Sequence, residues 1–554
     1  MPPDMSEDRP ASGADRPDTR RVNLGYYSRR RGCRHQPRTC PGDTPRLGRQ
    51  TLGNGRGSLF ASIPPGRFRP ISCRSRTQGA TTPNAYDRGE PIPPMWPIKT
   101  ILFTLLFSTL CAASLFNPAF GVMNYVLIYQ VDPQSAWWGI PLRDLGLRFS
   151  LYAAIFTLAG YLLSQRPRQA GPARGQYWEL GLLALVVIAY TSILTGVGYN
   201  SEMAARLDKF WKMMLFVFVM GRLISTRRDL TLLLWTFVIG TLYLGREAFI
   251  APPSRFHLGR LNDIGGPDFQ FSSGFAVHLA AVLPLVGAAF LVSKRWYLKL
   301  TAMVTGAFGF NAMVLCRTRS AFVGLAAGTA VAALMAPKPR RFQILLTLGV
   351  CAAGAFTLTD PGFWDRMLTI TDPQTRETDT AIVTRLDVWQ VGLRMVADYP
   401  LGVGAGNFER MTRAYYHERR AAHNTFLNCV AELGIPAGVI FLAMLASSFD
   451  RLRRTMKRAR AAPHSPELLY IGYGLFVSLV TYVVAGFFTE RFYTESFWWV
   501  LTLPLCLQKA VDAEYAAVID LAHSARGGPL EPILEHGGPR RGGPGHSRPS
   551  RVYA

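Results

Sequence analysis

Long apolar stretches separated by short polar loops run through most of this chain of 554 residues. They begin at Ile98 and recur to the neighbourhood of Leu507, and residues 178–197, 272–292 and 468–488 are typical. A helix needs roughly 20 apolar residues to cross a bilayer, so each stretch predicts a transmembrane helix. The pattern predicts an all-α integral membrane protein.

One long polar segment, residues 359–422, interrupts the apolar pattern late in the chain. It ends in His423-Asn424-Thr425-Phe426-Leu427, where the next apolar stretch begins. Within it, residues 384–396 and 408–420 mix apolar and polar positions in a way that predicts two helices. We therefore expect one large loop, with helices of its own, between two late transmembrane helices.

The positions of the basic residues predict the orientation of the chain in the membrane. Lys and Arg number 61 against 36 Asp and Glu, a net charge of +25. In a soluble protein this excess would suggest nucleic acid, but here the basic residues lie mainly in the tails and in alternate short loops. Basic loops face the cytoplasm. The loops concerned are 166–174, 222–228, 294–295, 338–341 and 451–460.

If all five basic loops are cytoplasmic, each intervening segment holds two crossings. The pattern then predicts about twelve transmembrane helices with both termini in the cytoplasm and the 359–422 loop in the periplasm. The apolar segment 98–131 is interrupted near Asn117-Pro118. It holds more apolar residues than one transmembrane helix needs, but fewer than two such helices need. We predict one crossing plus an interfacial piece there, because two crossings would move the N-terminus outside.

Both ends of the chain differ in composition from the membrane domain, which we place at residues 95–510. Residues 1–94 are rich in Arg, Pro, Ser and Gly and lack hydrophobic periodicity, which predicts a disordered basic tail. A translation start at Met95 would remove this tail, and a genuine tail resting on anionic lipid is the alternative. Residues 511–554 predict a second disordered tail, on the cytoplasmic side.

His423 is the first candidate for chemistry among the nine histidines. The predicted topology leaves only His257, His278, His417 and His423 outside the cytoplasm or within helices. His423 lies where the long loop meets an apolar helix, and a neutral imidazole there can accept a proton from a hydroxyl. The commoner role of a lone histidine at a helix start is an interfacial or capping residue.

Arginines near the same predicted face are the second candidates. Arg317 and Arg319 lie in a very short outer turn, and Arg385 lies in the long loop four residues before Trp389. The planar guanidinium suits phosphate oxygens and stays charged. Pairing with Asp387 or Asp398, or snorkelling towards the membrane surface, is the alternative role.

The remaining motifs argue against nucleotide and metal chemistry. Gly402, Gly404 and Gly406 follow no predicted strand, so they indicate a tight turn or a close backbone approach between two loop helices. No phosphate-binding loop or metal-binding histidine pair is evident. Glu377 and Asp379 are the nearest approach to an acidic pair. The sequence predicts a reaction with no metal and no cofactor.

Four short motifs in a fixed order resemble the O-antigen ligase superfamily. They are Arg385-x-x-x-Trp389, the segment 398–408, His423-Asn424-Thr425-Phe426-Leu427, and Glu432-Leu433-Gly434-Ile435-Pro436. The resemblance is strongest over residues 317–445. Asn124-Tyr125 and Asp132-Pro133 are similar to the branch described as exosortase-associated O-glycosylation ligases.

The resemblance implies a GT-C-like inner-membrane glycosyltransferase of lipopolysaccharide or exopolysaccharide biosynthesis. Such enzymes move a glycan from undecaprenyl diphosphate to an acceptor hydroxyl at the periplasmic face. By motif, His423 matches the essential histidine, and Arg385 and Arg319 match two arginines, with Arg317 a close alternative to Arg319. Supporting candidates are Asn424, Trp389 and Gly404.

The physical interpretation and the resemblance lead to one predicted mechanism. The arginines hold the diphosphate, His423 is the general base, and displacement at the anomeric carbon inverts its configuration. The partners expected are the lipid-linked glycan, membrane lipid and an acceptor, with no nucleic acid. A lipid, a growing polysaccharide or a protein as acceptor stays open, so a polymerase or a protein O-oligosaccharyltransferase is an alternative. A lipid-linked glycan transporter is the alternative from another class.

Overall fold

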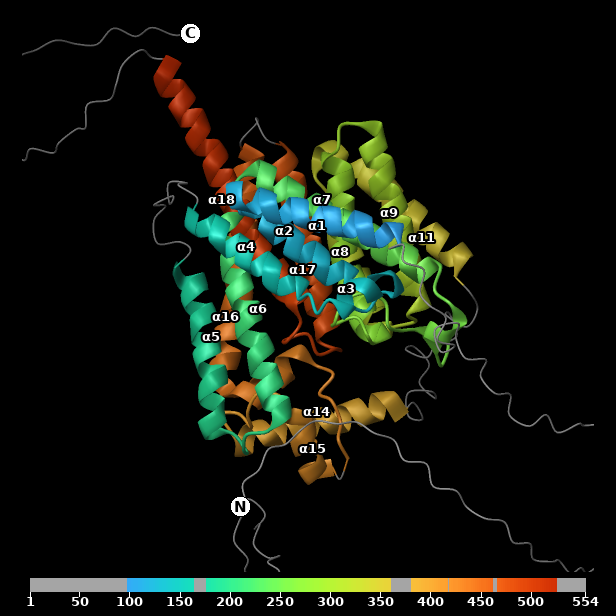
Figure 1. Ribbon diagram of the computed structural model, residues 1–554, viewed down its shortest axis with the longest axis vertical. Helices are drawn as coiled ribbons and strands as arrows, with labels where there is room; N and C mark the ends of the chain where they lie inside the picture. Colours follow the sequence, from blue (N-terminus) through green and yellow to red (C-terminus); the bar gives the residue numbers. More distant parts are fainter. Residues whose placement is uncertain (1–96, 164–175, 360–379, 417, 462–465, 526–554) are drawn as a thin grey trace, which may run out of the picture. The chain divides into compact units, whose positions relative to one another are not determined.

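The computed structural model describes residues 97–163, 176–359, 380–416, 418–461 and 466–525 (Figure 1). The predicted tail 1–94 lies outside the described residues, as does most of the first third of the predicted periplasmic loop. At the C-terminus, the last helix continues past residue 511, where a tail was predicted, and ends at Ala525.

The described elements are almost entirely helical. The helices in chain order are α1 (Ile98–Phe116), α2 (Ala119–Val131), α3 (Ile140–Asp144), α4 (Phe149–Leu163), α5 (Gln176–Thr195), α6 (Ser201–Leu223), α7 (Arg227–Phe249), α8 (Ser272–Val292), α9 (Trp296–Leu315), α10 (Arg319–Met335), α11 (Arg341–Leu358), α14 (Thr380–Asp398), α15 (Phe408–Tyr416), α16 (Thr425–Ala461), α17 (Pro466–Gly486) and α18 (Glu495–Ala525). Short 3-10 turns occupy Trp137–Gly139, Pro253–Arg255 and Lys338–Arg340. In the α7–α8 loop, β1 (Phe256–His257) pairs antiparallel with β2 (Arg260–Leu261).

Among the described residues, seven helices are long and apolar enough to cross a membrane, or up to nine if each of two bent helix pairs is one span. The prediction of an all-helical multi-pass membrane protein is therefore confirmed. The predicted count of twelve is not, and the GT-C-like likeness stays a prediction. Helices α8 and α17 form the centre of the bundle, since 72% and 83% of their apolar windows are buried.

Residues 98–131 form two antiparallel helices that pack on each other. The Asn124 side-chain amide on α2 donates to the Phe107 carbonyl oxygen at 3.4 Å and lies 3.3 Å from the Cys111 sulfur on α1. In this segment α1 alone is long enough to be a candidate span, as predicted, whereas nearly every residue of α2 is buried in protein; the interfacial position of α2 stays a prediction. Packing against protein, rather than lipid, lets this 13-residue helix be shorter than a lipid-exposed span.

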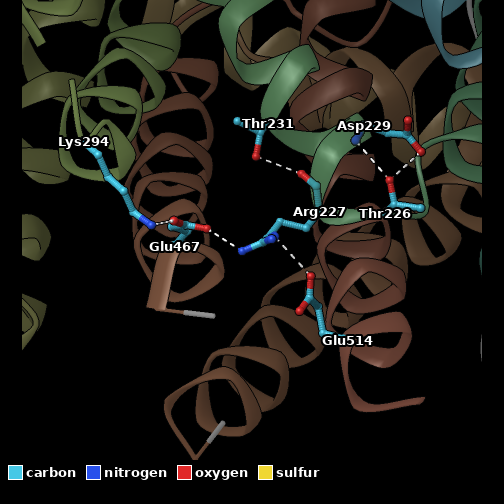
Figure 2. Close-up of polar contacts among 7 residues, drawn as sticks. All are labelled: Thr226, Arg227, Asp229, Thr231, Lys294, Glu467 and Glu514. Carbon is cyan, nitrogen blue, oxygen red and sulfur yellow. Dashed lines mark hydrogen bonds and ion pairs between the residues drawn. The ribbon is translucent and has the colours of Figure 1, made fainter. Parts of the chain in front are cut away.

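Two of the predicted basic loops, 222–228 and 294–295, meet the start of α17 at one end of the bundle, which we call the Arg227 end. Figure 2 shows the Arg227 guanidinium between Glu467 at 2.7 Å and Glu514 at 3.1 Å, while Lys294 reaches the other oxygen of Glu467 at 3.1 Å. Thr226 caps α7 by accepting the Asp229 N–H. The start of α7, the α8–α9 loop and the start of α17 therefore lie at one end of the bundle.

The loops that connect the same helices at their other ends gather at the opposite end, which we call the His423 end. Helix α7 rises about 34 Å over its 23 residues, and near its far end Glu247 pairs with Lys99 at 3.4 Å. The start of α1 therefore lies at the His423 end, because Lys99 is in its first turn. If that end is periplasmic, residue 98 is periplasmic too, which departs from the predicted cytoplasmic entry of the chain.

Candidate functional site

Helix α14 holds the chain just before His423. The indole N–H of Trp389 donates to the Ala422 carbonyl oxygen at 2.9 Å. Its ring packs edge-on against Phe487, with centroids 5.6 Å apart, where α17 ends. Arg385 lies one helical turn before Trp389, so the two residues share a face of α14. The face of α14 that carries Arg385 and Trp389 is therefore the one that faces the His423 segment.

His423 occupies the backbone position immediately before the capping residue of α16. The Asn424 side-chain oxygen accepts the N–H groups of Phe426 at 2.9 Å and Leu427 at 3.0 Å, which is how an N-cap asparagine satisfies the first turn of a helix. His423 itself has φ +48°, in the left-handed region that few residues other than glycine adopt. Its N–H donates to Glu490 Oε1 at 3.0 Å, which holds that conformation in place.

Burial, with a smaller contribution from three arginines, lowers the pKa of His423. Its side chain keeps an exposed edge, but the surrounding protein removes enough water to lower its pKa, and the charges of Arg385, Arg491 and Arg420 lower the pKa further, to about 4. The imidazole is therefore neutral at physiological pH and has a nitrogen lone pair available. A neutral imidazole can accept a proton, and the positive charges beside it can hold an anion at the same site.

Glu490 and Arg491 belong to the site but were missed in the sequence. Burial raises the pKa of Glu490 to about 7, and the negative charge of Glu432 adds to the effect. Both residues follow the apolar stretch of α17 directly. An adjacent acid and base at the end of a membrane span is a signal that could have found them, because charges there are costly unless they are used or paired.

The Arg491 guanidinium lies against the start of α8. A Cβ added at Gly274 would be 2.8 Å from Arg491 Nη1, so only glycine leaves room for it. Among the described residues, Arg491 Nε is buried without a hydrogen-bond partner. Arg491 therefore links the surroundings of His423 to α8 and keeps a donor available inside the bundle.

Arg317 and Arg319 lie in the α9–α10 turn beside the β1–β2 hairpin. Arg260 of the hairpin donates to the Cys316 carbonyl at 3.3 Å and to the Thr318 hydroxyl at 3.3 Å. A Cβ added at Gly259 would be 3.1 Å from Arg317 Nη1. These contacts form a second basic group, distinct from the contact between Trp389 and the His423 segment.

Helices α10 and α17 bring this second group to the His423 end. A Cβ added at Gly324 would lie 2.8 Å from the Ala485 Cβ, so the two helices are in close contact there. Arg319 precedes Gly324 by five residues and Glu490 follows Ala485 by five. Arg319 and Glu490 therefore each lie about 8 Å beyond the contact between Gly324 and Ala485, at the same end of the bundle.

Gly404 has a structural role in a turn that wraps round Glu432 of α16. The Gly404 N–H donates to the Glu432 carbonyl at 2.9 Å, and the Gly406 N–H to its carboxylate at 2.7 Å. Tyr493 donates to the same carboxylate oxygen at 2.7 Å. The prediction of a close backbone approach is confirmed, although the partner is α16 and not a second loop helix.

The region that carries these residues matches a known family. Residues 301–442 match the family model described as O-antigen ligase. This region is an O-antigen ligase domain. It contains Arg317, Arg319, Arg385, Trp389 and His423, so the predicted resemblance is confirmed there; the exosortase-associated branch stays a prediction. Residues 98–244 match a family of unknown function (DUF5935), and no curated protein matches the chain.

Proposed function

We propose that this protein is a glycosyltransferase of the inner membrane that moves a glycan from undecaprenyl diphosphate to an acceptor hydroxyl at the periplasmic face. The observation that carries the proposal is the position of His423 within the O-antigen ligase domain, held by Trp389 and Glu490, where burial and the charges of Arg385, Arg491 and Arg420 lower its pKa. A neutral base next to a cationic cradle suits the removal of a hydroxyl proton while a diphosphate departs.

Each group has one role in the proposed reaction. His423 accepts the acceptor's proton as the acceptor oxygen bonds to the anomeric carbon. The bond from that carbon to the phosphate oxygen breaks, and undecaprenyl diphosphate leaves with the bonding electrons, so the configuration inverts. Arg385 and Arg319 neutralise the leaving charge from two sides, with Arg317 an alternative to Arg319. No metal is needed if arginine supplies this charge.

Reconstitution in liposomes with an undecaprenyl-diphosphate glycan tests these roles. We expect His423→Ala to lower transfer about 10²- to 10⁴-fold, as loss of a general base does, and Arg385→Ala to raise the KM for the donor. Arg413→Ala is the matched control, since Arg413 is exposed on α15. Full transfer by His423→Ala would exclude the general-base role, and loss of transfer on adding chelator would exclude the metal-independent scheme.

The acceptor is assigned by offering three acceptors to the same liposomes. A lipid A core acceptor corresponds to an O-antigen ligase, a second lipid-linked glycan to a polymerase, and a serine-containing peptide to a protein O-oligosaccharyltransferase. The proposal is that the catalytic groups are common to all three. Transport of the lipid-linked glycan across the bilayer, with no new glycosidic bond, would instead identify a transporter.

A further inference from the structure

A cavity of about 350 Å³ lies beside the candidate site, between α2, the segment after it, α4 and the start of α18. Most of its wall comes from the region of unknown function, 98–244, and not from the O-antigen ligase domain. Its size is at the lower end of the range for small-ligand sites. The polar residues that line it are Tyr125, Tyr129, Asp132, Gln134, Ser135, Ser150 and Glu495.

Glu495 lines this cavity, and one of its carboxyl oxygens has no hydrogen-bond partner among the described residues. The residue is only 8% exposed, and its Oε1 accepts the Tyr125 hydroxyl at 3.2 Å. Among the described residues, its Oε2 is buried without a hydrogen-bond partner. A buried carboxylate oxygen without a partner is costly, so a ligand that donates a hydrogen bond here would gain affinity.

The rest of the wall combines rings with hydrogen-bonding groups. Tyr129 and Phe149 supply ring surface, and Tyr129 is held in place because its hydroxyl donates to Asp268, which also pairs with Lys209. Asp132 and Glu495 add two acidic side chains. Acidic side chains disfavour the binding of a negatively charged phosphate. Their oxygens accept hydrogen bonds, so they favour a ligand with many hydroxyl groups.

The cavity is close enough to His423 to share a substrate with it. Glu495 lines the cavity and follows Glu490 by five residues, and five residues span at most about 18 Å. Glu490 is bonded directly to the His423 backbone. A chain of a few sugars that starts at the reacting carbon or hydroxyl can therefore extend into the cavity.

We infer that this cavity binds sugar residues of the transferred or accepting glycan through hydrogen bonds from their hydroxyls to Glu495 and ring contact with Tyr129. The inference rests on the proposed glycan transfer and adds a substrate site in the region of unknown function. The reacting diphosphate stays at the arginines, away from the two carboxylates.

Saturation-transfer NMR on the detergent-solubilised full chain tests this binding without turnover. The probes are methyl glycosides of glucose, galactose, rhamnose and N-acetylglucosamine. We expect at least one to saturate wild type and to bind Glu495→Gln about tenfold or more weakly, since Gln keeps the bond to Tyr125 but loses one carboxyl oxygen as an acceptor. Ser150→Trp, at the exposed rim, should abolish binding, whereas Glu202→Gln, an exposed glutamate that does not line the cavity, should not change it.

The outcomes separate this inference from the proposed function. Binding of no glycoside, or equal binding by wild type, Glu495→Gln and Ser150→Trp, would overturn it. So would binding of Mn²⁺ that depends on Glu495 in place of a glycoside. If the protein binds a glycoside but transfers no glycan, the sugar-binding cavity would be supported and the proposed transfer reaction would be refuted. In turnover assays, a higher KM for the donor in Glu495→Gln assigns the donor glycan, and a higher KM for the acceptor assigns the acceptor.

Discussion

Glu490→Gln should make the protein more stable at neutral pH and leave His423 in place. The pKa of Glu490 rises from 4.5 to about 7 in the folded protein. Below pH 4.5 the carboxyl is protonated in both folded and unfolded chains, so it favours neither. As pH rises through 7 the folded protein must hold a charge that the unfolded chain holds more easily, and stability falls. Gln removes that cost and keeps an oxygen that can accept the His423 N–H.

The size of the effect follows from the difference in pKa. A difference of about 2.5 pKa units corresponds to about 3 kcal/mol, and screening of this partly exposed side chain reduces the expected gain to about 1–2 kcal/mol. That is a few degrees in Tm. The assay is thermal unfolding in detergent from pH 4 to pH 8, with Glu202→Gln as the matched control for an exposed glutamate.

The pH dependence of the difference is the decisive result. Wild type and Glu490→Gln should have nearly the same Tm at pH 4 and diverge between about pH 5 and pH 8, with Gln the more stable. A parallel offset at every pH would show that Glu490 is not a buried acid with a raised pKa. Glu490→Ala should lose transfer activity that Glu490→Gln keeps, because only Gln retains the acceptor for the His423 backbone.

Three further predictions follow from the same geometry. The kcat/KM of wild type should stay constant from about pH 6 to pH 8 and fall on the acid side near pH 4, where His423 takes up a proton; a fall near pH 6.5 would contradict this. Gly402→Ala should lower Tm by the equivalent of about 1–3 kcal/mol, because Gly402 has φ +90° and its Cβ would collide with α16, whereas Gly287→Ala, in open space, should not. Trp389→Phe keeps the ring and loses the bond to the Ala422 carbonyl, so transfer should fall about tenfold with little change in Tm; unchanged transfer would show that this bond does not position His423.

The helices and the grouping of basic loops could be predicted because both are local properties. A run of apolar residues or a pair of arginines is visible in the chain whatever it packs against. Arg227 and Lys294 do lie on one face, joined through Glu467. Helix α2 could not be predicted in this way, because its burial depends on α1, α4 and α7 packing round it, and a buried apolar helix of 13 residues has the same composition as an interfacial one.

In the candidate site too, residues in a local motif could be predicted, whereas residues brought in by packing could not. Trp389 and Asn424 form hydrogen bonds next to His423, and each belongs to a short sequence motif that could be recognised. Glu490 and Arg491 are 67 and 68 positions away from His423, and only the packing of α16 against α17 and α18 brings them together. The cavity round Glu495 is harder still to foresee, since its wall joins residues near 130 to residues near 495. Sequence spacing carries no signal for such contacts.

The charges round His423 also bear on when the proposed base becomes active. Burial lowers the pKa of His423, and the charges of Arg385, Arg491 and Arg420 lower it further; a base with a pKa near 4 accepts a proton only weakly. In the proposed complex, the diphosphate would offset the arginine charges but not the burial, and so would raise the pKa part of the way towards the ordinary 6.5 of histidine. The base would then gain strength only when a donor is in place. On this argument the acid limb of kcat lies at higher pH than that of kcat/KM, and Arg385→Gln brings the two limbs closer together; coincident limbs in wild type would mean that donor binding leaves His423 unchanged.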